Sequence, residues 1–206
     1  WDVAFASSTG RAYVFIGITD TVDACYSDDG GAWTGVAASG DIDSTGASGT
    51  FTWLMAAGDP SAGSNKIAMV TLETGNDMAF VARVNDAWQD TTTDTTLNEV
   101  SLVGNTRPYV GVCFEGYSGE ALLFYAESGN NVLKNRVWTA GSAPSATEYS
   151  LSSFGPTGSS MRSLQCYSVR DSSDVWVSAE NSLGNLYFSR WDGSASYASA
   201  WGSAQL

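Results

Sequence analysis

The chain has 206 residues, no histidine and 22 acidic against 9 basic side chains, which gives a formal net charge of −13. Without an imidazole the chain cannot form a Ser-His-Asp or Cys-His catalytic centre. The excess of acidic side chains argues against nucleic acid as a partner, because affinity for the phosphate backbone comes from clustered Lys and Arg. No apolar run reaches the roughly 18 residues of a spanning helix, so we expect no transmembrane segment.

The composition indicates a folded protein with an extracellular or cell-surface location. Hydrophobic residues make up 43% of the chain, which is enough for a packed core. Charged residues make up only 15%, whereas an average soluble domain has about 25%. Small and uncharged polar residues take the remaining positions, a balance that favours the outside of the cell.

An internal repeat is the most informative feature of the sequence. Four segments share one order of features: an apolar run, an acidic residue, a turn and a second apolar run. The turns contain Gly and Asn, as in Thr74-Gly75-Asn76, and these residues supply the positive φ angles of tight hairpins. The repeat therefore predicts four similar hairpins. The acids that precede the turns, at spacings of 53, 54 and 53 residues, are Asp20, Glu73, Glu127 and Glu180.

Short apolar segments around each turn predict the strands. They are rich in β-branched and aromatic residues and are bounded by turn residues. Near the end of the third strand, three repeats carry an arginine: Arg83, Arg136 and Arg190. Fourth strands are clearest at 99–103 and 148–151. In chain order, the first and second strands are expected at 1–6 and 12–16, 53–57 and 67–70, 109–114 and 122–126, and 164–167 and 175–179.

These patterns predict an all-β protein with a single domain, residues 1–206. No window of 11 or more residues keeps the apolar spacing of an amphipathic helix. Four-stranded antiparallel units that recur at about 53 residues are typical of β-propeller blades. A β-sandwich is the alternative, and the sequence leaves open whether four blades close into a ring or form an arc completed by another chain. The expected blades are 1–51, 52–107, 108–161 and 162–206.

A short motif in the first repeat resembles one found in sialidase-type propellers. The run Ser27-Asp28-Asp29-Gly30-Gly31-Ala32-Trp33 is similar to their Asp-box. The resemblance implies a turn that braces a hairpin and does not itself catalyse. Sialidases also need three convergent arginines, whereas the arginines of this chain recur once per repeat, which would spread them around a ring.

The end of the fourth repeat resembles the repeats of small fucose-binding propeller lectins. It reads Ser189-Arg190-Trp191-Asp192-Gly193, and looser copies lie at 135–138 and 82–86. The resemblance implies a propeller of lectin-like blades. It does not imply a fucose site, because the sugar-binding Arg of the family's second strand and the Glu of its third strand have no counterpart here.

The four repeated acids are expected on one face of the propeller, since antiparallel strands bring alternate turns to the same side. A loop with two further aspartates, between the first two repeats, joins this face. Such an oxygen-rich face could hold a hard cation such as Ca²⁺, and no other cofactor is expected. In the alternative, each acid caps the backbone amides of its own turn. The candidate metal ligands are Asp20, Asp41, Asp43, Glu73, Glu127 and Glu180.

The opposite face is expected to collect arginine and tryptophan side chains. These residue types are enriched at binding hot spots, where they combine large contact area with hydrogen bonding. In the alternative, each Trp fills the gap between neighbouring blades and each Arg pairs with a nearby carboxylate such as that of Asp192. The candidate ligand contacts are Arg83, Arg136, Arg190, Trp88, Trp138 and Trp191.

Cysteine and glutamate positions add two further expectations. Cys113 and Cys166 are 53 residues apart, which predicts the same first-strand position in neighbouring blades. Because face-packed sheets lie about 10 Å apart and a disulfide needs Cα atoms within about 7 Å, we expect buried free thiols. Glu115, Glu120 and Glu148 share one repeat, but their spacing does not indicate the carboxylate pair of a glycosidase.

Three hypotheses of function follow. The main one is a secreted or cell-surface, non-catalytic module that binds a glycan or an extracellular protein through the arginine and tryptophan face. The second is a structural subunit of an extracellular filament, sheath or coat, in which the chain associates with itself. The third is a fragment of a sialidase or another glycosidase.

Overall fold

The computed structural model describes most of the chain, and its regular structure is β-strand, arranged in four antiparallel sheets. Among the described residues, no helix is long and apolar enough to cross a bilayer. The described residues are 1–18, 21–28, 30–35, 42–43, 50–73, 78–85, 87–89, 110–126, 132–151, 161–195, 197 and 200–202.

The sheets follow one another along the chain, and we call them blades 1 to 4. Blade 1 consists of β1 (Asp2–Ala6), β2 (Arg11–Ile18), β3 (Thr21–Ser27), β4 (Thr34–Gly35) and β5 (Ile42–Asp43). Blade 2 consists of β6 (Phe51–Gly58), β7 (Ile67–Glu73), β8 (Met78–Val84) and β9 (Ala87–Gln89). Blade 3 consists of β10 (Val110–Phe114), β11 (Ala121–Ala126), β12 (Leu133–Trp138) and β13 (Tyr149–Leu151). Blade 4 consists of β14 (Met161–Ser168), β15 (Asp174–Asn181) and β16 (Leu186–Asp192).

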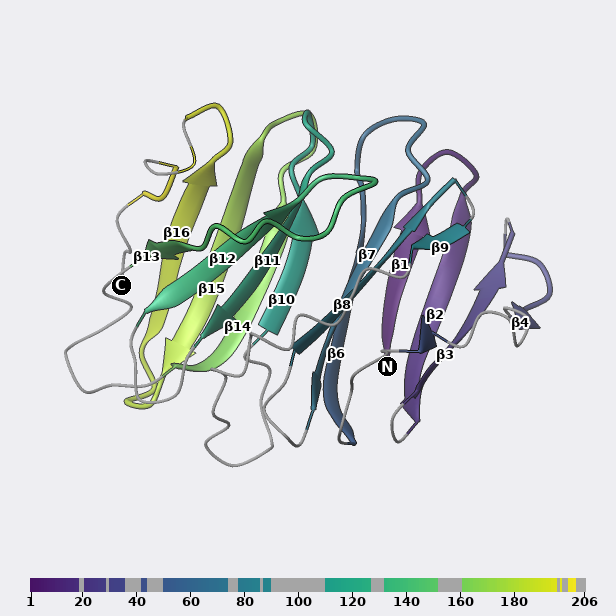
Figure 1. Ribbon diagram of the computed structural model, residues 1–206, viewed down its shortest axis with the longest axis horizontal. Helices are drawn as coiled ribbons and strands as arrows, with labels where there is room; N and C mark the ends of the chain where they lie inside the picture. Colours follow the sequence, from purple (N-terminus) through teal and green to yellow (C-terminus); the bar gives the residue numbers. More distant parts are fainter. Residues whose placement is uncertain are drawn as a thin grey trace.

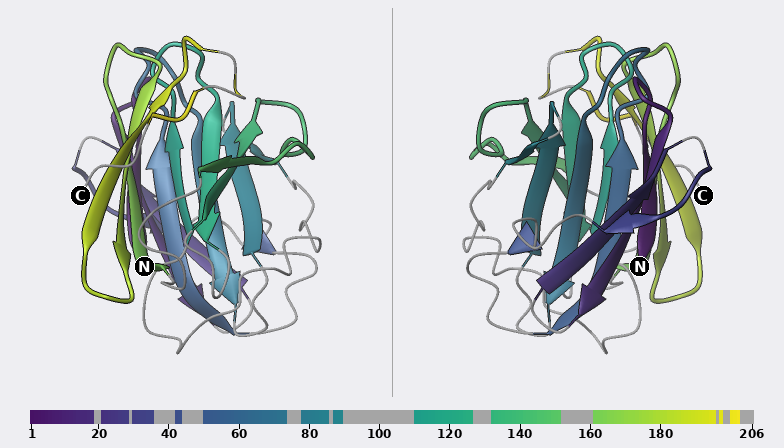
Figure 2. Two further views of the ribbon diagram at one scale, coloured as in Figure 1. Left: turned by 90° about the vertical axis from the view of Figure 1, so that its left-hand side faces the viewer. Right: turned by 90° about the vertical axis from the view of Figure 1, so that its right-hand side faces the viewer.

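The four blades lie side by side in chain order, with blades 1 and 4 at the two ends (Figure 1). Their first strands are neighbours, β1 beside β6, β6 beside β10 and β10 beside β14, and the other strands of each blade fan out from them (Figure 2). Four sheets in this fan, rather than two sheets face to face, confirm the all-β propeller-type architecture. The boundaries proposed for the single domain and its repeats stay predictions.

The predicted strands are present wherever the structure describes them, with bounds that differ by a few residues. The fourth strand expected at 148–151 is β13, whereas the one expected at 99–103 lies outside the described residues. In blade 2 the place beside β8 is taken by β9. In blade 4, Trp201 forms an isolated bridge with Trp191 on the outer strand.

Successive blades meet in three apolar layers. Side chains alternate between the two faces of a strand, so the middle blades can present one apolar face to each neighbour. The layers include Tyr13, Phe15, Ile67 and Met69 between blades 1 and 2; Val70, Phe80, Phe114 and Leu123 between blades 2 and 3; and Leu122, Phe124, Val175 and Val177 between blades 3 and 4.

Two tryptophans fill spaces within these layers. The fully buried ring of Trp138 lies 5.5 Å from that of Phe80 in blade 2 and 6.4 Å from that of Phe114, measured between centroids. Trp191 is also fully buried and packs edge-on against Tyr149, with 6.0 Å between ring centroids. These are the positions that the packing alternative describes for the repeated tryptophans.

Close approach of the first strands depends on two glycines. A Cβ on Gly58 of β6 would lie 1.9 Å from the carbonyl oxygen of Phe5 in β1. A Cβ on Gly111 of β10 would lie 2.6 Å from Cδ2 of Leu164 in β14. Both separations are shorter than any van der Waals contact, so the absence of a side chain lets the first strands of neighbouring blades meet.

All three cysteines are free thiols, and Cys113 and Cys166 are buried in the layer between blades 3 and 4. Their predicted equivalence is wrong. The two side chains point toward each other, and the Cys113 thiol is hydrogen-bonded to Cys166; burial and then this contact raise the pKa of Cys113. Because a shift of one residue turns a side chain to the other face of a strand, equal spacing did not place the two thiols on equivalent faces.

Replacing Trp138 tests how much the layer between blades 2 and 3 contributes to stability. We expect Trp138→Ala to lower the free energy of unfolding by about 3–5 kcal/mol, because it removes a fully buried ring and leaves a cavity. Chemical denaturation followed by circular dichroism measures the change. The control is Trp33→Ala, at an exposed position, which we expect to stay within about 0.5 kcal/mol of the parent chain. Equal losses in both variants would contradict this assignment.

Candidate functional site

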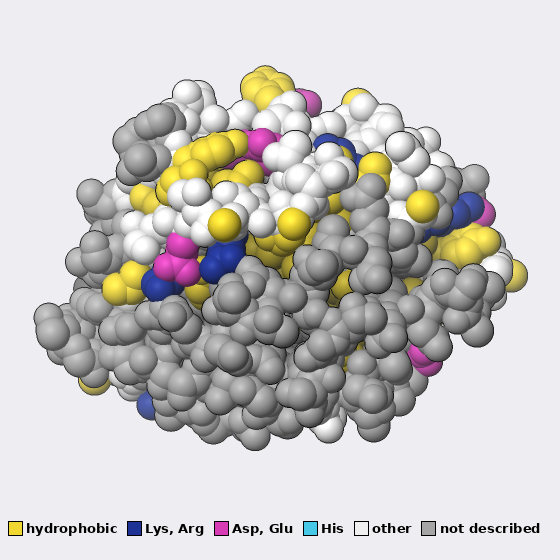
Figure 3. Space-filling view, in the orientation of Figure 1, with side chains coloured by type: hydrophobic (Ala, Val, Ile, Leu, Met, Phe, Trp, Pro, Cys, Tyr) yellow, Lys and Arg dark blue, Asp and Glu magenta, His cyan; other side chains and the backbone are white. Residues whose placement is uncertain are grey.

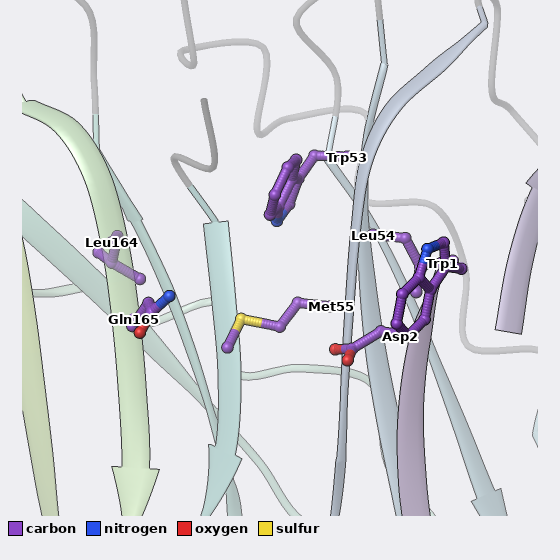
Figure 4. A pocket seen from close by; sticks show the side chains of 7 residues that line it. All are labelled: Trp1, Asp2, Trp53, Leu54, Met55, Leu164 and Gln165. Carbon is purple, nitrogen blue, oxygen red and sulfur yellow. The ribbon is translucent and has the colours of Figure 1, made fainter. Parts of the chain in front are cut away.

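A pocket of about 160 Å³ lies along the first strands of the blades. Two indole rings, those of Trp1 and Trp53, face it together with a carboxylate and a carboxamide (Figure 4). Side chains from three different blades therefore share one hollow. Its lining residues are Trp1, Asp2, Trp53, Leu54, Met55, Leu164 and Gln165.

Irregularities in two strands lie beside the pocket residues. The pairing of β6 with β7 shifts register between Phe51 and Trp53, and that of β14 with β15 shifts between Met161 and Ser163. A bulge of this kind bends the strand and re-aims its side chains, and bulges are common beside binding sites. The Trp53 ring is 38% exposed and the next residue of the strand is buried, as alternation along a strand predicts.

The polar groups of the pocket are held in place. Oδ1 of Asp2 accepts a hydrogen bond of 2.8 Å from the amide of Val3, and Oδ2 accepts one of 2.7 Å from the amide of Ala56 in blade 2. The side-chain oxygen of Gln165 accepts a hydrogen bond from the Tyr167 hydroxyl. A fixed carboxylate and amide beside two flat apolar rings can orient a small polyhydroxylated ligand, whose hydroxyls need hydrogen-bond partners and whose C–H face needs apolar contact.

The three repeated arginines do not converge. Arg83 is buried in the layer between blades 1 and 2, with its guanidinium carbon 4.9 Å from the ring centroid of Tyr13. Arg136 lies opposite Leu123 and hydrogen-bonds the hydroxyl of Tyr125, both residues of the layer between blades 2 and 3. Arg190 lies instead on the far side of blade 4.

The Arg190 side chain is exposed and ion-paired. Its Nη2 is 2.9 Å from Oδ1 of Asp174 and 3.5 Å from Oδ2 of Asp192. The pKa of Arg190 is raised by the hydrogen bond to Asp174. Pairing with Asp192 is the arrangement that the packing alternative describes.

The tryptophans expected at the same site have other surroundings. Trp138 and Trp191 are buried in the layers between blades, and Trp88 belongs to β9, although its side chain lies outside the described residues. None of the six candidate ligand contacts is among the residues that line the pocket. The structure therefore separates from the pocket those predicted contacts whose side chains it describes.

Most of the candidate metal ligands fall outside the described residues. This holds for all atoms of Asp20, Asp41 and Glu127 and for the side chains of Asp43 and Glu73, whose backbones belong to β5 and β7. The sixth ligand, Glu180, is half-buried on β15. Among the described residues, no three His, Cys, Asp or Glu side chains come together as metal ligands would. A calcium site therefore stays a prediction.

The segment that resembles an Asp-box forms a turn between β3 and β4. The amide of Gly31 donates a hydrogen bond of 2.8 Å to the carbonyl of Asp28, and Gly30 adopts φ +73°. Two nitrogens of Arg11 lie 2.6 and 3.1 Å from the two carboxylate oxygens of Asp28, and these bonds lower its pKa. This ion pair ties the turn to β2 of the same blade, and the identity of the segment as an Asp-box stays a prediction.

Two acidic side chains of blade 3 are committed to contacts with blade 4. Buried Glu115 accepts hydrogen bonds of 2.5 Å from Nε1 of Trp191 and 2.7 Å from the Ser118 hydroxyl. Glu120 accepts hydrogen bonds from the hydroxyls of Tyr197 and Thr139. Together they join blade 3 to blade 4. Because both carboxylates already accept hydrogen bonds from neighbouring side chains, they are poorly placed to act as general acid or base.

The third glutamate, Glu148, forms an ion pair with Lys134 at 2.7 Å and accepts a hydrogen bond from Tyr125. On the face of the molecule shown in Figure 3, basic and acidic side chains likewise lie beside one another among uncharged ones.

Similar solved structures identify the class of fold. The chain superposes on the BP39L lectin from Burkholderia pseudomallei with a TM-score of 0.62 and 13% identity, over 98% of this chain and 54% of that one. It superposes on the SapL1 lectin with a TM-score of 0.61 and 16% identity, over 100% of this chain and 61% of that one. An intramolecular trans-sialidase from Ruminococcus gnavus gives a TM-score of 0.52 and 17% identity, over 93% of this chain and 42% of that one.

At these identities the similarity establishes a shared fold alone, one that the two lectins and the trans-sialidase have in common. The chain spans little more than half the length of the two lectin chains that it matches. No protein-family model matches the sequence. No curated protein matches it either.

Replacing Glu115 tests the effect of its burial. Desolvation raises the pKa of Glu115 above its ordinary value of 4.5, against the hydrogen bonds from Ser118 and Trp191. As pH rises above 4.5, the unfolded chain loses this proton before the folded chain does, so stability falls until the folded group also ionises. Glu115→Gln keeps an acceptor for Trp191 and cannot ionise.

We therefore expect Glu115→Gln to unfold at a higher temperature than the parent chain at pH 8. Above pH 4.5, the ordinary pKa of a glutamate, its melting temperature should also depend less on pH than that of the parent. Thermal melts across pH measure both effects. The control Asp171→Asn changes an exposed carboxylate. It should keep the melting temperature of the parent chain at pH 8 and the parent's dependence of melting temperature on pH. A variant that melts below the parent chain at pH 8 would show that the buried charge is stabilising.

Proposed function

We propose that this chain is a secreted or cell-surface, non-catalytic module that binds carbohydrate. One observation carries the proposal: the first strands form a pocket in which two indole rings face a fixed carboxylate and an amide. Flat apolar rings beside oriented hydrogen-bonding groups suit a sugar, which has an apolar C–H face and a rim of hydroxyls. The fold supports it, because one of the similar structures is a lectin in complex with alpha methyl fucoside.

We further propose that the ligand is the neutral terminal ring of a glycan. The pocket, at about 160 Å³, is smaller than the roughly 300–1,000 Å³ of sites for drug-sized ligands, so it suits one sugar ring. Asp2 is its charged side chain, and the chain carries a formal net charge of −13. Both disfavour an anionic sugar, and the three arginines that would bind its carboxylate lie in separate places.

The state of the carboxylates supports a binding role over an enzymatic one. In the described part of blade 3, Glu115 and Glu120 are engaged by side chains of blade 4. Glu148 is paired with Lys134. A glycosidase needs two carboxyl groups free to act across a cleft, about 5 to 9 Å apart. Asp2 is the carboxylate that lines the pocket, and both of its oxygens already accept backbone hydrogen bonds.

The arginine and tryptophan face remains a second candidate for ligand contact through Arg190. Among the predicted contacts whose side chains are described, Arg190 is the most exposed, at 46%. A protein partner suits this side of blade 4 better than a sugar, because it is a broad sheet surface and not a hollow.

Replacing Trp53 tests the proposed site. A glycan array selects a neutral saccharide, and isothermal titration calorimetry then measures its affinity for three chains: the parent, Trp53→Ala and Trp33→Ala. We expect Trp53→Ala to weaken binding about tenfold or more, since aromatic anchors dominate such sites. Trp33 is also exposed but lies outside the pocket, so its replacement should leave the affinity unchanged.

Two results would contradict the proposal. If no glycan on the array binds the parent chain, the binding role is wrong. If a glycan binds but Trp53→Ala and Trp33→Ala have the parent affinity, carbohydrate binding stands and the pocket assigned to it is wrong.

A further inference from the structure

The far side of blade 4 is a sheet face that no described strand covers (Figure 2, left). Alternate residues of β15 point inward and are buried, as Val175 and Val177 are. The residues between them point outward, and the register places Trp176 opposite Tyr167 on β14. Four large apolar side chains on this face are between 43 and 52% exposed: Tyr167, Trp176, Leu186 and Phe188.

Blade 1 has a face at the other end of the molecule that no described strand covers (Figure 2, right). Phe5 and Ile16 are 62 and 45% exposed on the side opposite the buried residues of β1 and β2. Val3, Val14 and Cys25 follow one another across this face in the pairing of β1 with β2 and β3, and all three are half-buried. Large apolar side chains that are exposed together on one face are a mark of interaction sites.

Inside the chain, each face of this kind is covered by the next blade, and the loops between first and second strands fasten the pair. In blade 1, the Ser7 hydroxyl donates to the carbonyl of Ser61 in blade 2 at 2.5 Å. The Ser61 hydroxyl then donates to the carbonyl of Gly116 in blade 3 at 2.8 Å. The amide of Gly116 donates to the carbonyl of Ser172 in blade 4 at 2.7 Å.

The loop between the first and second strands of one blade thus contacts the same loop of the next blade. The loops of blades 2 and 3 contact both the loop before them and the loop after them. For the loops of blades 1 and 4, the hydrogen bonds described above run to one neighbour each, toward the inside of the arc. Each end blade therefore has both a face that no described strand covers and a loop with hydrogen bonds to one neighbour. Blade 4 presents one of the two surfaces of a blade-to-blade interface, and blade 1 presents the other.

We propose that a second copy of this chain docks head to tail, with its blade 1 on the far side of blade 4. This contact continues the relation that the chain repeats three times, in which the later face of one blade meets the earlier face of the next. Contacts between two copies of the same face have no precedent among the described blades.

The contact is heterologous, since it joins two different surfaces, and such contacts produce a closed ring or a filament. Two copies would bring eight blades together, within the range of known propellers. The pocket adjoins the far side of blade 4, because its Gln165 accepts a hydrogen bond from Tyr167 on that face. Phe5 and Trp176 are not among the residues that line the pocket, so substitutions there test self-association separately from sugar binding.

Two charge substitutions, one on each face, test the proposal by native mass spectrometry and analytical ultracentrifugation. We expect the parent chain to assemble beyond the 21.7 kDa of one copy. Phe5→Glu on blade 1 and Trp176→Glu on blade 4 should each be monomeric. Mixed together, the two variants retain one intact face each and should form a pair of chains and nothing larger.

Cys25 gives a second measurement, because its thiol lies on the proposed interface of blade 1. A maleimide should label Cys25 quickly in monomeric Phe5→Glu and slowly in the parent assembly, while buried Cys113 and Cys166 stay unlabelled in both. Tyr117→Glu changes an exposed aromatic residue away from both faces and should leave the mass of the assembly unchanged. Circular dichroism checks that each variant is folded.

Three outcomes would overturn the proposal. A parent chain that stays monomeric at high micromolar concentration would show that a copy of itself does not cover these faces. Variants that still pair on their own would show a contact between identical faces. Loss of assembly in Tyr117→Glu would show that added charge, and not the chosen faces, breaks the association.

Discussion

Burial of both faces of a sheet is the constraint on which the rest of this structure depends. In β7, four consecutive residues, Ile67 to Val70, are at most 1% exposed, because alternate side chains enter the layers toward blades 1 and 3. A sheet of this kind cannot be stable alone, since half of its apolar side chains would face water. Each inner blade therefore needs a neighbour on either side, and the four sheets form one folded unit.

The same constraint separates inner blades from end blades in the sequence. β11 reads Ala-Leu-Leu-Phe-Tyr-Ala and is buried throughout, whereas β15 reads Asp-Val-Trp-Val-Ser-Ala-Glu-Asn and alternates buried with more exposed positions. A continuous apolar run is expected of a strand covered on two sides, and alternation of a strand covered on one side. The alternation in β15 agrees with the position of blade 4, which has a described neighbouring blade on one side.

The fold was predictable from the repeat because strand composition and turn chemistry act locally and recur about every 53 residues. The direction of individual side chains was not. A displacement of one residue moves a side chain to the opposite face, which explains why Arg190 points away from the protein while Arg83 is buried between blades. It also explains why Cys113 and Cys166 meet rather than occupy equivalent places.

The pocket could not be predicted for a different reason. Its residues come from three blades and are brought together by the packing of first strands, which no single repeat encodes. Trp53 was recognised only as part of a strand, and the register shift beside it has no clear signal in the sequence. Asp2 serves both the pocket and the packing of the blades. Its carboxylate lines the pocket and accepts a hydrogen bond from the amide of Ala56 in blade 2.

The hydrogen-bonded loops at one end of the sheets have a geometric consequence for the whole molecule. They hold neighbouring blades together at one end, and the glycines at 58 and 111 let the first strands approach closely. These contacts set the angle through which each blade is turned from the one before it. That angle, multiplied along the chain, is the curvature of the arc. The bond between Ser61 and Gly116, local as it is, thus helps to determine how many blades a full turn would hold.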